Sequence, residues 1–316
     1  MAIITSPEEF KKKDSIYVFL AGPIQGAEDW QSKLPDLPGI TWINPRRKSF
    51  EGFNWNKQVQ WETLGLRISD YILFWIPEKT EYMDPNRDYA QTTRMELVEN
   101  LVRGKKIILG IEPGIHARRY MEEKYHLYST LGLPVFTSLY ECIGALKDQI
   151  SKRTSNIWFT SDTHFGQQRT LNLSKRPFKG VREMNLSIIE KWNSLVLPTD
   201  EVYHLGDFGD YDVLKYLNGR IHLIKGNYDT HPSSDFVEIL EGPVDKVIED
   251  IPFTLCHKPS QRSKRYTLFG HIHGTKRNIV GGLNVGIDCH SYCPISLETV
   301  KFYMNAPYDN EVYSSY

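Results

Sequence analysis

The chain has 316 residues, of which 40% are hydrophobic and 24% are charged, and this balance excludes a disordered, collagen-like or coiled-coil protein. Its 38 basic and 39 acidic residues are divided evenly between the two halves, so neither half is a basic nucleic-acid-binding module. The ten histidines are divided unevenly, because eight of them lie beyond residue 150. Metal chemistry is therefore expected in the C-terminal half.

Strand-like and helix-like segments alternate through the first half of the chain. The predicted strands are residues 16–22, 41–44, 71–76, 106–111 and 134–139. The predicted helices are residues 56–68, 93–103 and 116–130. Several of the strands are apolar throughout, as buried parallel strands are. This alternation predicts an α/β domain with a doubly wound parallel sheet, whose ligands bind beyond the carboxyl ends of the strands.

A polar stretch at residues 147–156 breaks this pattern, and we place a domain boundary there, which predicts domains of residues 1–150 and 151–316. The second half continues with predicted helices at 182–195 and 212–218. Its predicted strands are 157–161, 201–205, 221–224, 245–256, 266–270, 283–288 and 298–304. The many strands after residue 244 predict an α+β domain built as a β-sandwich with flanking helices.

Polar residues that can bind metals follow the strand ends of the second half. They are Asp162, His164, Asp207, Asn227, Asp229, His257, His271 and His273. Carboxylate, imidazole and amide ligands without a thiolate motif suit pairs of Mn, Fe or Zn ions. Two such ions about 3.5–4 Å apart can share a carboxylate and clamp a phosphoryl group. Each motif alone could be a turn, but five in order, each at a strand end, favour a metal site.

Residues 156–305 resemble the calcineurin-like metallophosphoesterase superfamily, whose D-x-H, G-D, G-N-H-D, H and G-H-x-H signatures these residues match. The resemblance implies that Asp162, His164, Asp207 and His273 hold one divalent ion, and that Asp207, Asn227, His257 and His271 hold the other. Asp207 would bridge the two ions. Manganese is the favoured metal, with iron, zinc and nickel as alternatives. Segments 176–178, 184–185, 192–193 and 284–288 also resemble one compact bacterial and phage branch.

The chain departs from this signature at one position, because Tyr228 replaces the histidine that would donate a proton to the leaving group. We assign Tyr228 and Asp229 to the catalytic part of the site. An unperturbed tyrosine has a pKa near 10, so it matches acid catalysis at neutral pH poorly. His231 lies three residues further on and could replace the missing acid, but we favour its reading as an ordinary loop residue before Pro232.

The first half contains no glycine-rich loop that would hold a phosphate, which argues against kinase and dehydrogenase functions. It contains five short elements instead: Gly22-Pro23-Ile24, Asn44-Pro45-Arg46, Trp61-Glu62, a strand that opens with Ser69-Asp70, and Thr93-x-x-Glu96. The last of these also fits a helix capping box, in which Thr93 and Glu96 satisfy the free amides of a helix start. Taken alone, that structural role is the better explanation of Glu96.

Together these elements make residues 14–145 resemble the nucleoside 2-deoxyribosyltransferase family, a doubly wound α/β fold that cleaves the N-glycosidic bond of 2′-deoxyribonucleosides. The resemblance implies that Glu96 attacks C1′ of the sugar, that Asp70 protonates or holds the leaving base, and that Tyr17 orients the glutamate. The implied substrate-binding residues are Gly22, Pro23, Asn44, Arg46 and Trp61. A carboxylate nucleophile suits an oxocarbenium-like transition state, and a covalent glycosyl intermediate could pass to a new base or to water.

Several features of this half stay open. Arg46 or Arg47 could bind a phosphate of a nucleotide, although each could equally be solvated or paired in a salt bridge. Asp84 and Asp88 are both candidates for recognition of the base. Members of this family often complete their site with a neighbouring subunit, so we expect a homo-oligomer formed through the N-terminal domain.

We therefore predict a bifunctional enzyme that acts on a small nucleoside or nucleotide, with N-glycosidic chemistry in the first domain and phosphate ester hydrolysis in the second. One alternative is a phosphoesterase with a catalytically silent, nucleotide-sensing N-terminal domain; another is a metal-dependent nuclease, which the balanced charge disfavours. No apolar run approaches the roughly 18–20 residues of a membrane span. The N-terminus lacks a signal-peptide pattern, and the four cysteines form no Cys-x-x-Cys pair. We expect a cytoplasmic location in a bacterium or a phage-infected host.

Overall fold

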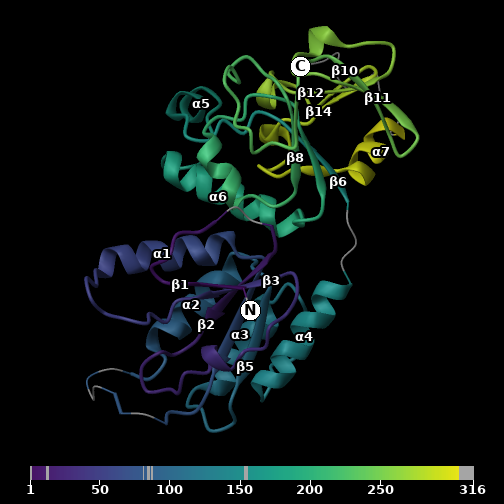
Figure 1. Ribbon diagram of the computed structural model, residues 1–316. Helices are drawn as coiled ribbons and strands as arrows, with labels where there is room; N and C mark the ends of the chain where they lie inside the picture. Colours follow the sequence, from purple (N-terminus) through teal and green to yellow (C-terminus); the bar gives the residue numbers. More distant parts are fainter. Residues whose placement is uncertain are drawn as a thin grey trace. The chain divides into compact units, whose positions relative to one another are not determined.

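The structure is a computed structural model that describes residues 2–11, 14–80, 82–83, 86, 88–152 and 156–305. The chain forms two compact units, residues 1–154 and 155–316. Figure 1 colours the first unit from purple to teal and the second from teal through green to yellow. Within the described residues, no helix is both long and apolar enough to cross a membrane.

The first unit is built on a parallel five-stranded sheet with the strand order β1-β3-β2-β4-β5. The strands are β1 (Ala2–Thr5), β2 (Ile16–Ala21), β3 (Ile40–Asn44), β4 (Tyr71–Ile76) and β5 (Ile107–Ile111). The helices are α1 (Trp55–Ile68), α2 (Gln91–Val102), α3 (Arg118–Tyr128) and α4 (Leu139–Ser151), with a short 3-10 turn, η1 (Gln31–Lys33). The predicted doubly wound α/β class is confirmed.

Both faces of this sheet are covered, which explains why its central strands are apolar throughout. On one face, Val18 and Leu20 pack in a core that includes Cys142 and Leu146 of α4. On the other face, α1 approaches β2 so closely that a Cβ on Gly65 would lie 2.8 Å from the ring of Phe19. A glycine is therefore required at this point of α1.

The strand order has a reversal point at β2, because β3 lies on one side of it and β4 on the other. Ligands of open α/β sheets bind beyond the carboxyl ends of strands at such a point. Gly22 follows β2 there, and a Cβ on it would collide with the Trp75 carbonyl oxygen and lie 2.8 Å from the ring of Trp30. The carboxyl edge near β2 is thus the expected place for a site.

One prediction for the first unit is wrong. Residues 134–139 were expected to form a strand, but they contribute only an isolated bridge between Phe136 and Gly110. Ser138 ends this segment and caps α4 in a capping box with Glu141, whose side chain is exposed. Helix α4 and strand β1 were not expected, and the polar stretch assigned to the domain boundary begins inside α4.

The second unit contains two five-stranded sheets, with strand orders β15-β6-β7-β8-β9 and β10-β11-β12-β14-β13. The first sheet consists of β6 (Ile157–Thr160), β7 (Glu201–His204), β8 (Arg220–Ile224) and β9 (Glu238–Leu240), all parallel, and the antiparallel β15 (Ile295–Ser296). The second consists of β10 (Val244–Ile248), β11 (Ile251–Leu255), β12 (Tyr266–Phe269), β13 (Asn278–Ile279) and β14 (Gly282–Asn284). Strands β11, β12 and β14 are parallel to one another.

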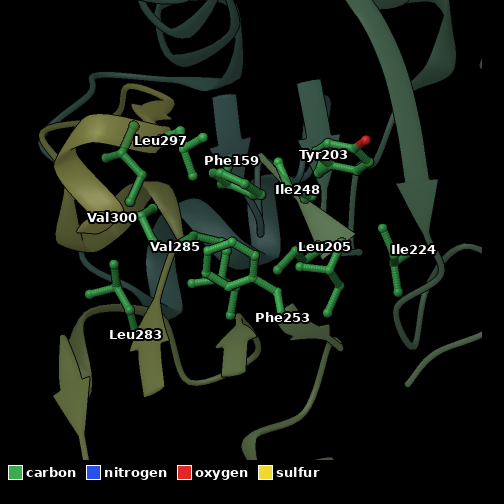
Figure 2. Close-up of a cluster of buried hydrophobic side chains, with 13 residues drawn as sticks. Phe159, Tyr203, Leu205, Ile224, Ile248, Phe253, Leu283, Val285, Leu297 and Val300 are labelled. Carbon is green, nitrogen blue, oxygen red and sulfur yellow. The ribbon is translucent and has the colours of Figure 1, made fainter. Parts of the chain in front are cut away.

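A single hydrophobic core joins the two sheets. Phe159 and Leu205 from one sheet meet Phe253 from the other, and all three side chains are fully buried (Figure 2). The helices of this unit are α5 (Gln168–Leu173), α6 (Val181–Leu195) and α7 (Leu297–Asn305), and short 3-10 turns include η2 (Tyr211–Tyr216). The predicted sandwich of sheets with flanking helices is therefore confirmed.

The last predicted strand, residues 298–304, is wrong because these residues form helix α7. Leu297 and Val300, three residues apart, are both buried in the core between the sheets. The hydroxyl of Ser296 accepts a hydrogen bond from the amide of Thr299 at the start of the helix. The run 245–256 is a hairpin of β10 and β11 rather than one strand.

Candidate functional site

The loops that follow five strands of the second unit carry all seven predicted metal ligands. Asp162 and His164 follow β6, Asp207 follows β7, and Asn227 follows β8. The second sheet contributes His257 after β11 and both His271 and His273 after β12. Since β6, β7 and β8 are parallel, their carboxyl ends lie at one edge of the sheet.

These side chains form two clusters that can each hold a metal ion. The clusters are Asp162, His164 and His273, and Asp207, His257 and His271, and within each the ligand atoms lie within 4.8 Å of one another. The Oδ2 atom of Asp207 lies 3.3 Å from Nε2 of His257 and 3.7 Å from Nε2 of His164. Asp207 therefore faces both clusters, as a bridging carboxylate would.

Asn227, the remaining predicted ligand, lies beside the second cluster. Its carboxamide nitrogen is 3.4 Å from Nδ1 of His271, and that same Nδ1 is 3.1 Å from Nε2 of His257. Because the oxygen and nitrogen of a carboxamide are assigned only from their neighbours, a half-turn of the group would direct its oxygen to this position. The donor set of two carboxylates, four imidazoles and one amide suits a pair of divalent ions.

The ligand histidines are held so that one ring nitrogen is left for a metal. Nδ1 of His257 donates to the carbonyl oxygen of Leu205 at 2.8 Å, and Nδ1 of His164 is paired with the Gln167 side chain at 2.8 Å. The opposite nitrogen of His164 is buried without a hydrogen-bond partner in the described structure. Such outer partners fix the tautomer of a metal-bound imidazole, so the residues present fit a metal centre.

Burial sets the ionisation of these ligands. It lowers the pKa of His164 to about 4, which keeps the imidazole in the neutral form that binds metals. Burial also raises the pKa of Asp162 to about 6, against the opposing effects of His257 and His273. A carboxylate in this position is stabilised by additional positive charge, which is what a bound cation would supply.

Five of the seven ligands adopt a backbone conformation that residues other than glycine rarely use. Their φ angles are 58° for Asp162, 49° for His164, 58° for Asp207, 72° for His271 and 47° for His273. Left-handed conformations of this kind concentrate at functional sites, where the surrounding structure imposes them. The strain is therefore an independent mark of function at these loops.

Neighbouring glycines make room for the ligand loops to meet. A Cβ on Gly206 would lie 2.6 Å from Cα of Gly226 and 2.7 Å from Nδ1 of His257. A Cβ on Gly226 would collide with the Asp207 carboxylate, and one on Gly270 would collide with Asp162. The glycines of these motifs are thus required by close approach.

A buried ion pair supports the first cluster. The guanidinium of Arg176, whose side chain is 0% exposed, donates to both oxygens of Asp288 at 2.9 Å. It also donates to the carbonyl oxygens of Asp162 and Thr163, and Asp288 pairs with Nδ1 of His273 at 2.9 Å. Arg176 and Asp288 lie within segments noted in the sequence, but their joint role in holding the ligand loop is visible only in the fold.

Asp229, predicted to be catalytic, is engaged in holding the loops. Its carboxylate is 1% exposed and accepts hydrogen bonds from the backbone amides of Asp207, Phe208 and Gly226 and from the hydroxyl of Tyr211. These bonds connect the loop after β7 with the loop after β8. Asp229 is therefore placed as a positioning residue, and a direct catalytic contact stays a prediction.

Tyr228 lies at the open side of the metal clusters. Its backbone amide donates to Oδ1 of Asp207 at 3.0 Å, and its ring meets the His164 ring edge-on with centroids 5.7 Å apart. It also lines a cavity of about 560 Å³ together with His164 and His273. His231 is exposed, pairs with Thr230 and does not line this cavity, which fits its reading as a loop residue.

In the first unit, Tyr17 and Asp70 contact each other at the amino ends of β2 and β4. The Asp70 carboxylate accepts from the Tyr17 backbone amide at 2.8 Å, and both residues are buried. Burial raises the pKa of Tyr17 to about 12. Tyr17 is five residues, or about 16 Å along a strand, from Gly22 at the carboxyl edge. This placement favours a structural role, and their predicted roles in base release stay untested.

The residues predicted to bind substrate include Gly22 and Pro23, which directly follow β2. Trp61, from α1, donates to the Glu8 carbonyl oxygen at 2.7 Å and stacks on Phe10 with centroids 5.0 Å apart. Trp61 is thereby engaged in fixing the segment that follows β1. Any contribution it makes to substrate binding stays a prediction.

Asn44 and Arg46 organise the loops at the carboxyl edge. The Asn44 side chain accepts from the Arg46 amide at 2.9 Å, and the Arg46 guanidinium bonds Gln31 and the carbonyl oxygens of Ile24, Ala27 and Glu28. Both residues line a second cavity, also of about 560 Å³, together with Arg47 and Lys48. Arg46 is therefore already committed to the protein, and Arg47 also donates to the Ser49 carbonyl oxygen and to the Gln58 side chain.

Glu96 does not cap a helix, which corrects the structural explanation suggested by its sequence. Helix α2 begins at Gln91, its N-cap is Ala90, and no side chain caps it. Thr93 and Glu96 are consequently interior residues of the helix. Of the two candidates for base recognition, Asp88 is exposed before α2 and Asp84 lies outside the described residues.

The neighbour of Glu96 is a second carboxyl group that was not predicted as a site residue. Burial, then the charges of Glu62 and Glu99, raises the pKa of Glu96 to about 8. Burial also raises the pKa of Glu62, and the Gln58 side chain donates to Glu62 at 2.8 Å. The Trp61-Glu62 element was the only sequence signal for this partner. When two neighbouring carboxyl groups have raised pKa values, one of them can act as a proton donor while the other acts as a base.

Comparisons with known proteins agree with this division of the chain. A model of the family described as nucleoside 2-deoxyribosyltransferase like matches residues 15–114, and a model of the calcineurin-like phosphoesterase superfamily domain matches residues 156–285.

Two proteins and one solved structure are similar to parts of the chain. The uncharacterized protein MJ1445 of Methanocaldococcus jannaschii is 32% identical over 171 residues, covering 46% of this chain and 88% of that protein. The gene 66 protein of Mycobacterium phage L5 is 33% identical over 107 residues, covering 31% of this chain and 51% of the phage protein. The crystal structure of AQ665, a protein of unknown function from Aquifex aeolicus, has 24% identity and a TM-score of 0.41, covering 48% of this chain and 100% of its own. The chain is therefore a fusion of a nucleoside 2-deoxyribosyltransferase-like domain, residues 15–114, and a calcineurin-like phosphoesterase domain, residues 156–285.

Proposed function

We propose that this protein is a bifunctional nucleotide-metabolising enzyme, whose C-terminal unit hydrolyses a phosphate ester at a two-metal centre. The observation that carries this proposal is the position of Asp207, whose Oδ2 atom faces both ligand clusters. Two divalent ions at such a centre supply Lewis acidity to a phosphoryl group and lower the pKa of a water molecule. The mixed oxygen and nitrogen donors favour manganese, with iron, zinc and nickel as alternatives.

The protein's own residues hold this centre in place before a substrate binds. Arg176 fixes the loop of Asp162 and His164 through two backbone carbonyl oxygens and orients His273 through Asp288. Asp229 ties the loop of Asp207 to that of Asn227. Preorganised groups of this kind lower an activation barrier because they need no rearrangement during the reaction.

For the N-terminal unit, we propose cleavage or transfer at the N-glycosidic bond of a nucleoside or nucleotide, with Glu96 as the nucleophile. Glu62 supports this role, because an adjacent carboxyl group could carry the proton that Glu96 must lose before it attacks. The Gln58 side chain donates to Glu62 and accepts from Arg47 at 3.3 Å, which connects the carboxyl pair to the rim of the basic cavity.

Product analysis by mass spectrometry tests both halves of the proposal at once. The full chain is incubated with deoxynucleosides, deoxynucleotides, cyclic nucleotides and bis-p-nitrophenyl phosphate, with Mn²⁺ or with EDTA. We expect hydrolysis of the phosphate ester with Mn²⁺ only, and release of a free base under both conditions. The panel is repeated with Fe²⁺, Zn²⁺ and Ni²⁺, and failure to hydrolyse any phosphate ester with each of the four metals would refute the phosphoesterase proposal.

One observation favours a second function for the N-terminal unit, namely nucleotide sensing without catalysis. The pKa of about 8 leaves Glu96 mostly protonated at neutral pH, and a protonated carboxyl group can bind a ligand but is a poor nucleophile. Calorimetric titration of the wild type and Glu96→Gln with the same nucleotides separates the two functions. Binding to both proteins without base release by either would support sensing.

A further inference from the structure

The cavity beside the metal clusters borders only one of the two clusters. Its lining includes His164 and His273 of the first cluster, but neither His257 nor His271 of the second. It extends from Tyr228 to helix α5 and has a volume of about 560 Å³, which is enough for part of a nucleotide. A substrate whose phosphorus lies between the clusters would therefore project one of its substituents into this space.

The charges in this cavity are uneven. The carboxylate of Asp288 at its wall is already paired with Arg176 and His273. Arg169, on α5, is exposed at the cavity, and none of the described residues forms an ion pair or hydrogen bond with its guanidinium. The cavity thus offers one uncommitted cation, with Leu173 and Ile272 as apolar lining.

The uncommitted positive charge of Arg169 favours one kind of leaving group in this cavity. A leaving group that departs as a stable anion needs no proton. Such an anion is stabilised by a positive charge placed where the negative charge develops, and Arg169 provides one.

We infer that this cavity binds the leaving group of a phosphoanhydride, with Arg169 binding the departing phosphate. The inference rests on the proposed phosphoesterase function and names its substrate class, a nucleotide pyrophosphate. Water forms a new bond to one phosphorus, and the anhydride P–O bond breaks. Its electron pair leaves with the second phosphate, and the protons of water pass to the products and the solvent.

The test compares two substrates with the full chain in Mn²⁺. Release of AMP from diadenosine pyrophosphate measures anhydride cleavage, and release of p-nitrophenol from bis-p-nitrophenyl phosphate measures cleavage of a diester without a second phosphate. The variants are Arg169→Gln and Arg169→Lys. Arg182→Gln serves as the matched control, because Arg182 is an exposed arginine in the first turn of α6 that does not line the cavity.

We expect Arg169→Gln to lower the ratio of kcat/KM for the pyrophosphate to kcat/KM for the diester by about 10-fold or more, the effect of losing one charged hydrogen bond. Arg169→Lys should recover part of the loss, and Arg182→Gln should change neither rate. Diester hydrolysis without pyrophosphate hydrolysis by the wild type would overturn the inference and leave the proposed function standing. An unchanged ratio in Arg169→Gln would overturn it too. Inactivity on both substrates would overturn the inference as well, and inactivity on the whole substrate panel with each of the four metals would refute the proposed function itself.

Discussion

The two units surround their carboxylates with opposite kinds of neighbour. In the C-terminal unit, Asp207 lies among imidazoles and backbone amides, and although burial raises its pKa, the hydrogen bond and charge of His257 hold the pKa below the ordinary value. In the N-terminal unit, burial and the second carboxyl group Glu62 raise the pKa of Glu96 to about 8. The surroundings of Asp207 therefore favour binding of a cation, whereas those of Glu96 favour retention of a proton. Burial alone therefore does not decide the chemistry of a carboxyl group.

The largest expected effect separates the two units completely. Asp207→Asn should lower the phosphoesterase kcat by at least about 10³-fold. The substitution removes the negative charge that faces both metal clusters, and several kcal/mol of transition-state stabilisation depend on that charge. Base release should stay within twofold of the wild type. The rates of p-nitrophenol and base release, measured on the same preparation, check this expectation. Loss of both activities in a folded variant would contradict independent sites.

The corresponding change in the N-terminal unit should have the opposite pattern. Glu96→Gln should lower base release by about 10²–10⁴-fold, the range for a positioned carboxyl group that acts in the transition state. Phosphoesterase activity should not change. Chromatographic analysis of the free base, with Glu123→Gln on the exposed face of α3 as the control, measures the effect. A folded Glu96→Gln protein with normal base release would exclude the nucleophile role.

The buried ion pair between Arg176 and Asp288 provides a test of preorganisation in the C-terminal unit. Arg176→Met leaves the buried Asp288 without its arginine partner, with only His273 still paired to it, which should cost about 3–5 kcal/mol of stability and lower phosphoesterase kcat/KM by about 10–100-fold. Denaturant unfolding and bis-p-nitrophenyl phosphate assays measure the two effects, and Arg182→Gln is the exposed control. Unchanged activity in the destabilised variant would show that the clamp serves stability alone.

The raised pKa of Glu96 predicts a pH-dependent stability of the N-terminal unit. Between pH 4.5 and about 8, the unfolded chain has lost this proton while the folded protein keeps it, so stability decreases as the pH rises through this window. Glu96→Gln removes this decrease. Since each unit of pKa shift corresponds to about 1.4 kcal/mol, its Tm relative to the wild type should rise across the window by more than roughly 2–4 °C, the shift that about 1 kcal/mol produces in a domain of this size. A constant difference in Tm would contradict the raised pKa.

The smallest expected effect concerns the leaving group. Tyr228→His should raise the rate on a 5′-monophosphate relative to bis-p-nitrophenyl phosphate by a few-fold, because a histidine near its ordinary pKa donates a proton more readily than tyrosine. The wild type should prefer the diester. If the wild type prefers monophosphates and Tyr228→His does not change that preference, another group such as His231 is the acid.

The metal ligands of the C-terminal unit could be predicted from the sequence, because metal binding needs particular residue types at the ends of strands. Asp162, Asp207 and His271 each lie within three residues of the end of a strand, so their spacing survives as short motifs. The carboxyl pair has no such signal, since Glu62 and Glu96 come from the middle of two helices. The Thr93-x-x-Glu96 spacing even suggested a capping box, which the helix start at Gln91 excludes.

The two-unit α/β and α+β architecture and the convergence of the metal ligands could be predicted from the sequence, since apolar strands and the polar residues at their ends are local features. That residues 297–305 form a helix is visible only in the fold, because Leu297 and Val300 pack in a core formed by both sheets. The fold also shows that Tyr17 pairs with Asp70, that Asp229 connects two loops, and that Glu62 lies near Glu96. These are contacts between residues far apart in the chain, and packing selects them rather than local propensity.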